Sequence, residues 1–362
     1  MTGQVTIRIF ANQTPESALF SVTGGEYKLN FFPGGAETLK RGELVLILKY
    51  DERIAVKTIK SPGFICDSVL LSDITGNSAF TLRLNSQVPE RQSYSGDLKC
   101  FADFGTLVFL NTLNIDSYIA GVVRTEGGSG RSMEYLKTQA VIARTYMHKY
   151  FSKHAADRYN LCDNTHCQAF NGVVNDSLIR KAVEATKGQV ILTKDSVLII
   201  SAFHSNCGGE TSASEDVWLT GQSYLKSISD PYCRNSPNAR WRKSYSTGDW
   251  ISYLNRSGLE VKPEKISSLN FSQSTRLKEY CVDSFSIPLI QIRSDLGLRS
   301  TYFSVIAEQD SVVLEGKGYG HGAGLCQEGA MEMAARGFDY IKIIEFYYPG
   351  VIITDIQNCR EH

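Results

Sequence analysis

The stretch that decides the fold reads Ser132-Met-Glu-Tyr-Leu-Lys-Thr-Gln-Ala-Val-Ile-Ala-Arg-Thr-Tyr-Met-His-Lys149. Its apolar residues recur at steps of three and four, the spacing of one helix face: Leu136, Ala140, Ala143, Met147 and, beyond the quoted stretch, Phe151. Ser132 can cap the first turn, and the basic stretch 149–153 suits the negative end of the helix dipole. The pattern predicts a helix over residues 133–152.

Upstream of this helix, residues 1–110 carry strand patterns. Val5-Thr-Ile-Arg-Ile-Phe10 alternates with period two, and the runs 43–49 and 106–110 are apolar and of strand length. Downstream, helices are expected at 177–186, 249–257, 327–336 and 340–346. Strands are expected at 189–193, 197–203 and 311–315. A further pair of strands is expected after the helix at 249–257. Because strands and helices do not alternate as regular βαβ units, the sequence predicts an α+β fold with a β-rich core and a few helices.

Composition excludes several classes of protein. The 362 residues contain 38 basic and 38 acidic side chains, which argues against a nucleic-acid or anionic-membrane surface. No apolar run reaches the ~18 residues of a membrane span, so we expect no transmembrane segment. The opening Met1-Thr-Gly-Gln lacks a secretory signal, so the protein is either cytosolic or begins after a removed one. Nine cysteines cannot all pair within one chain.

Glu126 is the candidate catalytic residue. It lies between Val122-Val123, interpreted as an apolar strand end, and the glycines of Gly127-Gly-Ser-Gly130. Partial burial there would raise the pKa of the carboxyl and let it act as a general acid near neutral pH. The plainer alternative is a loop glutamate paired with Arg124.

A candidate metal site lies in Cys162-Asp-Asn-Thr-His166-Cys167, with His154 eight residues upstream. Zinc favours four nitrogen and sulfur ligands, and this loop can supply three of them. A disulfide between Cys162 and Cys167, or two free thiols, remain open as alternatives.

Two further segments carry polar residues. In Phe203-His-Ser-Asn-Cys-Gly-Gly-Glu-Thr211, histidine and serine suggest a nucleophile, but a polar loop contact explains them more simply. Gly316-Lys-Gly-Tyr-Gly-His-Gly-Ala-Gly324 fits neither nucleotide-binding glycine pattern. It is interpreted as a bend or as a groove wall with His321 and Gln327 facing a ligand.

Taken in order, these segments resemble the SpoIID/LytB family. The matching stretches are Leu113–Val123 with Glu126, Leu136–Tyr146, Asp163–Gly172, Phe203–Thr211, Gly318–Ala330 and Phe346–Gly350. The resemblance covers roughly residues 1–355. One departure is the loop after the glutamate, which commonly reads Glu-Met-Pro in the family and reads Glu126-Gly-Gly here. Cys207 and Cys326 also stand where serine is common, which suggests a subgroup with its own thiol or metal arrangement.

The resemblance implies a peptidoglycan lytic transglycosylase that cleaves denuded glycan strands and leaves 1,6-anhydro-N-acetylmuramyl ends. Glu126 matches the family's catalytic glutamate, with a groove beside the helix at 133–152. Polar groups expected to contact the glycan are Gln139, Arg144, Ser205, His321 and Gln327. Some members bind zinc near the segment that matches 162–167, which would make Cys162, His166, Cys167 and His154 a structural zinc site.

The resemblance also suggests how the chain is organised and where it acts. Residues 1–110 would form a β-rich part, 111–233 the catalytic core with the zinc loop, 234–300 an insertion or second subdomain, and 301–362 the rest of the core. Because peptidoglycan lies outside the cytoplasmic membrane, we expect an extracytoplasmic protein, in the periplasm or cell wall. A spore-specific role does not follow from the sequence.

Two other functions compete with the transglycosylase. Some relatives are described as enhancers of an amidase, so the chain could be a non-catalytic module that binds peptidoglycan or activates a cell-wall amidase. A zinc-dependent hydrolase that uses Cys162, His166 and Cys167 is the third hypothesis, although thiolate-rich zinc sites are more often structural.

Overall fold

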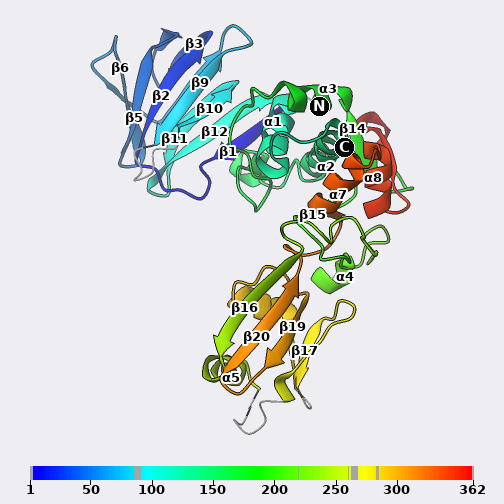
Figure 1. Ribbon diagram of the computed structural model, residues 1–362. Coiled ribbons are helices and arrows are strands. Elements are labelled where there is room, and N and C mark those ends of the chain that lie inside the picture. Colours follow the sequence, from blue (N-terminus) through cyan, green and yellow to red (C-terminus); the bar gives the residue numbers. More distant parts are fainter. Residues whose placement is uncertain are drawn as a thin grey trace. The chain divides into compact units, whose positions relative to one another are not determined.

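The computed structural model describes residues 3–84, 91–218, 220–259, 261, 268–282 and 285–360 (Figure 1). It divides into two compact parts, Met1–Val190 (unit 1) and Ile191–His362 (unit 2). Strands in several sheets accompany separate helices, which confirms the predicted α+β class. The boundary between the units falls inside the segment 111–233, and the four-part functional division stays a prediction. Among the described residues, no helix has the length and apolar character needed to cross a membrane.

Unit 1 begins with a series of antiparallel strands, as the sequence predicted for residues 1–110. Its strands are β1 (Gln4–Ile9), β2 (Ser17–Gly24), β3 (Glu26–Phe32), β4 (Ala36–Lys40), β5 (Leu44–Tyr50), β6 (Arg53–Thr58), β7 (Phe64–Cys66), β8 (Ser68–Asp73), β9 (Ala79–Leu84), β10 (Arg91–Ser95), β11 (Asp97–Asp103), β12 (Thr106–Asn114), β13 (Leu161–Cys162) and the first half of β14 (Gln189–Leu192), which continues into unit 2. Twelve of them precede the first helix.

Strands β1 to β13 form two sheets that share an aromatic core. One sheet has the order β13-β1-β12-β11-β8-β3-β4 and the other β10-β9-β2-β5-β6-β7. Phe20 of β2 stacks on Phe80 of β9 at 4.8 Å, and both rings meet the edge of Tyr27, which belongs to β3 in the first sheet. Side chains alternate between buried and partly exposed along β2 and β3, so each sheet presents one apolar face.

The helices of unit 1 follow β12 in the chain (Figure 1). They are α1 (Ile115–Val122), the π-helical turn η1 (Val123–Gly127), α2 (Met133–Lys149), the short η2 (Ala155–Asp157) and α3 (Ser177–Ala185). The predicted helices at 133–152 and 177–186 are confirmed as α2 and α3. The interpretation of Val122-Val123 as a strand end is wrong, because Asn114 caps a helix there through its Oδ1, which accepts hydrogen bonds from Asp116 N and Ser117 N.

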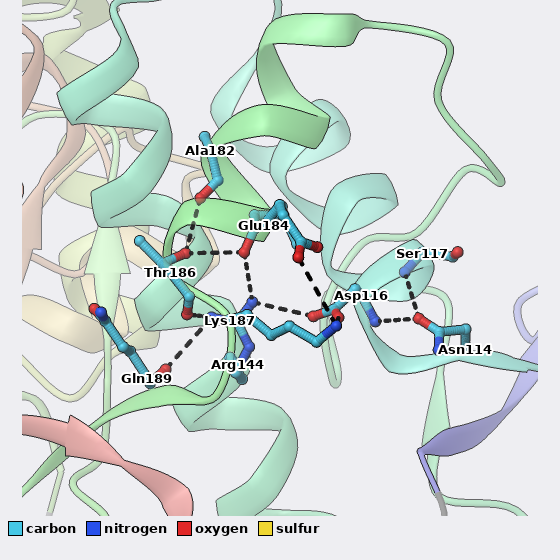
Figure 2. Close-up of polar contacts among 10 residues, drawn as sticks. Asn114, Asp116, Ser117, Arg144, Ala182, Glu184, Thr186, Lys187 and Gln189 are labelled. Atoms are coloured by element: carbon cyan, nitrogen blue, oxygen red, sulfur yellow. Dashed lines mark hydrogen bonds and ion pairs between the residues drawn. The ribbon is translucent and has the colours of Figure 1, made fainter.

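Arg144 connects the three helices of unit 1 (Figure 2). Its side chain is 1% exposed. The guanidinium donates to the carbonyl oxygens of Thr186 at 2.8 Å and Val183 at 3.3 Å, next to the end of α3, and to Asp116 Oδ1 of α1 at 3.3 Å. One buried cation therefore satisfies carbonyl groups that end a helix and would otherwise lack a partner.

Unit 2 has its own sheets and helices. Its strands are β15 (Phe203–His204), β16 (Arg240–Ser246), β17 (Glu279–Val282), β18 (Phe285–Pro288), β19 (Phe303–Ala307), β20 (Ser311–Lys317), β21 (Leu325–Cys326) and β22 (Ile352–Asp355). Its helices are α4 (Ser214–Val217), α5 (Thr247–Arg256), α6 (Leu289–Asp295), α7 (Gln327–Ala335), α8 (Tyr340–Tyr347) and the 3₁₀ turn η4 (Ile356–Asn358). Figure 1 shows β16, β20 and β19 as one sheet near α5.

Most predicted elements of unit 2 are confirmed, and one is wrong. Strand β20, the pair β17–β18 and helices α5, α7 and α8 lie where the sequence predicted them. The predicted strand at 197–203 is wrong, since that stretch makes an isolated bridge at Leu198 and only Phe203 begins a strand. The predicted insertion 234–300 packs with β19 and β20 in one core around Trp250. Glu260, 262–267, Asp283 and Ser284 of that segment lie outside the described residues.

Replacement of Arg144 by Met should destabilise the protein by about 2 to 4 kcal/mol, because buried carbonyl groups and Asp116 lose their partner. Urea unfolding followed by circular dichroism measures the change. Arg131→Met, at an exposed position just before α2, is the control and should leave the transition unchanged. Equal transitions for both variants would show that the Arg144 network does not stabilise the helices.

Candidate active site and metal cluster

Glu126 lies in the π-helical turn η1, between α1 and the glycines that precede α2. Such turns occur mostly as single interruptions of helices and are frequent at functional sites. The side chain is half-buried, and its Oε1 accepts a hydrogen bond of 2.8 Å from the backbone N–H of Ala169. The carboxyl group is therefore fixed in orientation and is not turned into open solvent.

Two effects act in opposite directions on the pKa of Glu126. Burial raises the pKa because it disfavours the charged form, and the hydrogen bond from Ala169 lowers it. Burial is the larger effect, so the pKa lies above its ordinary value. A carboxyl group in this state keeps its proton to a higher pH than a surface glutamate does, as a general acid requires.

The segment that carries Ala169 packs directly on α1 and η1. Asn171 N donates to Thr125 Oγ1 at 3.3 Å, one residue before Glu126 in the turn. The fully buried ring of Phe170 lies against Gly121, where a Cβ atom would come within 2.4 Å of Phe170 Cε2. Only glycine at this position of α1 lets the segment approach closely enough for Ala169 to reach the carboxylate.

Gln139 of α2 lies against the same turn. A Cβ atom on Gly127 would lie 3.4 Å from Gln139 Cγ, so the two residues are in contact. The Gln139 side chain is 3% exposed, and its Nε2 makes no hydrogen bond within the described part of the chain. An unpaired amide beside a catalytic candidate is a donor that a bound ligand can use.

The candidate metal ligands His154, Cys162, His166 and Cys167 form the His–Cys cluster. Their ligand atoms all lie within 4.8 Å of one another. Cys167 Sγ is 3.4 Å from His154 Nε2, and His166 Nδ1 is 3.6 Å from Cys162 Sγ and 3.8 Å from Cys167 Sγ. Ligands of a tetrahedral zinc ion are separated by about 3.6 Å for a sulfur and a nitrogen, given ordinary bond lengths. The four residues therefore fit a closed zinc shell. Neither Cys162 nor Cys167 forms a disulfide.

Local structure holds the His–Cys cluster together. Cys162 belongs to β13, which pairs in parallel with β1. Asp163 fixes the start of the loop by accepting hydrogen bonds from the backbone N–H groups of Phe10 and Ala11. Asp157 Oδ2 lies 3.7 Å from His154 Nδ1, opposite the nitrogen that faces Cys167. A carboxylate in that position orients a metal-binding histidine.

The remaining predicted contacts, Ser205, His321 and Gln327, belong to unit 2. Burial lowers the pKa of His321 to about 4, so its imidazole is neutral at neutral pH. The ring contacts the rings of His204 and Trp218, with centroids 5.5 and 5.4 Å away. Trp218 is 39% exposed, so an aromatic face is accessible next to His321.

Some residues of these sites could not be found from the sequence. The N–H of Ala169 carries no side-chain signal, and Trp218 lies outside the motifs that matched the family. Asp157 was three residues from His154 and could have been noticed as its partner. Arg144, predicted to contact glycan, instead lies in the interior among helix ends.

Comparisons with known proteins agree with the motifs. The family model described as stage II sporulation protein, SpoIID, matches residues 104–192, which include Glu126 and the His–Cys cluster. An uncharacterized protein of Brachyspira hyodysenteriae is 32% identical over 277 residues, covering 74% of each chain. Stage II sporulation protein D of Bacillus subtilis is 26% identical over 266 residues, covering 68% of this chain and 76% of the relative.

A further relative bears on the choice between functions. The protein named amidase enhancer in Bacillus subtilis is 31% identical over 289 residues, covering 65% of this chain. The match spans only 40% of that longer relative.

Replacement of Glu126 by Gln should raise the melting temperature at about pH 7.5 more than at about pH 4. Burial raises the folded-state pKa above the ordinary value of 4.5, so the folded protein binds this proton more tightly than the unfolded chain does. The contribution of Glu126 to stability is thus full below pH 4.5 and is lost as the pH rises through the folded pKa. Differential scanning fluorimetry across this range measures the effect. Glu52→Gln, on an exposed turn, should show no such pH dependence, and the same behaviour for both variants would contradict the shift.

Proposed function

The chain belongs to the SpoIID/LytB family, and on that premise we propose that it is a peptidoglycan lytic transglycosylase. Its substrates would be glycan strands stripped of stem peptides, cut between N-acetylmuramic acid and N-acetylglucosamine. The observation that carries this proposal is the half-buried Glu126, with its pKa raised by burial and its orientation fixed by Ala169.

One carboxyl group suffices for this reaction. Hydrolytic glycosidases usually use two carboxylates, one as the acid and the other as the base or nucleophile. Here the protonated Glu126 donates its proton to the glycosidic oxygen as the bond from C1 to that oxygen breaks. The resulting carboxylate takes the proton of the C6 hydroxyl as O6 bonds to C1. The products are a free hydroxyl on N-acetylglucosamine and a 1,6-anhydro ring, no water is consumed, and Glu126 ends protonated.

Polar and aromatic groups are proposed as glycan contacts, and those of each unit are described by themselves. In unit 1, the unpaired amide of Gln139 can donate to a sugar oxygen beside Glu126. In unit 2, we propose Ser205, His321 and Gln327, together with the exposed ring of Trp218 on which a sugar face can stack. Arg144 is not among them, because its guanidinium is used in the interior.

The His–Cys cluster would hold a structural zinc ion. When bound, zinc would supply a rigid link between the loop at 162–167 and His154. Ala169 lies two residues after Cys167. A rigid loop would therefore also fix the position of the Ala169 N–H, which donates a hydrogen bond to Glu126. Four protein ligands fill a tetrahedral shell, which speaks against the zinc-dependent hydrolase, since that reaction needs an open position for water.

A non-catalytic role is the second candidate, and the relative named amidase enhancer favours it. In that case the chain would bind peptidoglycan or activate a cell-wall amidase without cutting glycan itself. The glycine-rich loop after Glu126 is compatible with this alternative. Either function would place the protein outside the cytoplasmic membrane, because peptidoglycan is found there.

Incubation of the purified protein with denuded glycan strands should release 1,6-anhydro products, identified by mass spectrometry. Glu126→Gln should lower the rate by a factor of about 100 or more, because general acid and base catalysis are both lost. Glu52→Gln, at an exposed turn, is the matched control and should keep full activity.

Three results would separate the functions. Reducing-end products would indicate hydrolysis and contradict the transglycosylase. Equal cleavage by the wild type and Glu126→Gln would remove Glu126 from the mechanism. No cleavage, together with stimulation of an amidase that survives Glu126→Gln, would favour the non-catalytic alternative.

A further inference from the structure

A second group of metal-ligand side chains lies in unit 2. Cys207, Asp230, Cys233 and Cys326 are all buried, and their ligand atoms lie within 4.8 Å of one another. We call this group the three-cysteine cluster. Neither the proposed reaction nor the His–Cys cluster uses any of its members.

The three-cysteine cluster joins segments that are far apart in the chain. Cys207 follows β15, and Cys326 ends β21, 119 residues later. These two strands pair in parallel, with His204 opposite Cys326. Asp230 and Cys233 come from the segment after the bridge between Glu210 and Ser229. The fold therefore brings three separate segments to one buried point.

The spacing of the ligand atoms fits a metal ion better than a disulfide. Cys207 Sγ lies 3.3 Å from Cys233 Sγ and 3.2 Å from Asp230 Oδ2. Around a tetrahedral zinc ion, two sulfur ligands are about 3.8 Å apart, and a sulfur and an oxygen about 3.6 Å apart. A disulfide requires sulfur atoms about 2.05 Å apart and would leave the other two members unused.

Backbone and side-chain donors already orient these ligands. Cys326 Sγ accepts from Cys207 N at 3.3 Å and from Gly329 N at 3.4 Å, at the N-terminus of α7. Asp230 accepts from Tyr347 Oη at 2.9 Å through Oδ2 and from Tyr232 N at 2.8 Å through Oδ1. Such outer hydrogen bonds fix thiolate and carboxylate ligands in the geometry that a metal needs.

Charge supplies a further reason for a cation. A buried carboxylate among thiols needs a positive partner, and buried charges are generally paired or bound to metals. The nearby Arg276 donates two hydrogen bonds to backbone carbonyl oxygens, those of Cys207 and Glu210. These two donors therefore do not bind the carboxylate of Asp230. A divalent ion would neutralise the carboxylate and thiolates directly, and the thiols would release their protons on binding.

We propose that Cys207, Asp230, Cys233 and Cys326 bind a zinc ion that is separate from the ion of the His–Cys cluster. Three sulfur ligands and one carboxylate oxygen form a closed tetrahedral shell, which is typical of a structural site. The ion would link the loop after β15, the segment 230–233 and the start of α7, and so stabilise unit 2.

The zinc content of the full-length chain tests this proposal. It is measured by inductively coupled plasma mass spectrometry after dialysis. The expected values are two ions per chain for the wild type and one each for Cys167→Ser and Cys233→Ser, which affect different clusters. Cys281→Ser, at an exposed cysteine of β17, is the matched control and should keep two ions. A metal-free Cys167→Ser protein would overturn the proposal.

A second measurement does not depend on how Cys233→Ser folds. X-ray absorption at the zinc edge of Cys167→Ser should show three sulfur ligands and one oxygen, because only the three-cysteine cluster would be occupied. A shell of one sulfur atom with nitrogen and oxygen atoms, which Cys162, His154 and His166 of the altered His–Cys cluster would supply, would assign the ion elsewhere and contradict the proposal. All nine thiols of the wild type should react with a thiol reagent after denaturation with a chelator and without reductant. If Cys207 and Cys233 did not react, they would be joined in a disulfide, and this result would also contradict the proposal.

Discussion

The hydrogen bond from the backbone N–H of Ala169 to Glu126 is the contact on which the candidate active site depends. It fixes the direction of a carboxyl group that is half-buried. Because it also favours the ionised form, it keeps the carboxyl group able to lose its proton and regain it within one reaction. Burial favours the protonated form and the hydrogen bond from Ala169 favours the ionised form, and the proposed chemistry needs both forms.

The surrounding structure serves to hold that contact. Phe170 packs on Gly121, Thr125 accepts from the same segment, and the His–Cys cluster lies immediately before it in the chain. Arg144 then holds α1 against the end of α3, so the helix that carries the π turn cannot shift freely. The motifs that match the family thus include residues of two kinds. Some lie at the proposed site, and others, such as Arg144, hold the helices around it in place.

Much of this arrangement could be predicted from the sequence, and the failures have physical causes. Helix α2 was predicted because its apolar residues keep a helical period and its end is basic. Helix α1 was missed because Tyr118–Val123 are buried almost throughout, and an apolar run without period can be a strand or a helix. The same ambiguity produced the wrong strand at 197–203. The ligands at 162–167 are local in sequence, whereas Cys207 and Cys326 meet only through the fold.

The most direct measurement is the titration of the Glu126 carboxyl carbon by NMR in protein labelled at glutamate. The resonance is assigned as the one that is missing from Glu126→Gln. Our account predicts a midpoint above the ordinary value of 4.5, because burial outweighs the hydrogen bond from Ala169. A midpoint at or below that value would mean that Glu126 is ionised whenever a surface glutamate is. It would then lack the proton with which the proposed reaction begins.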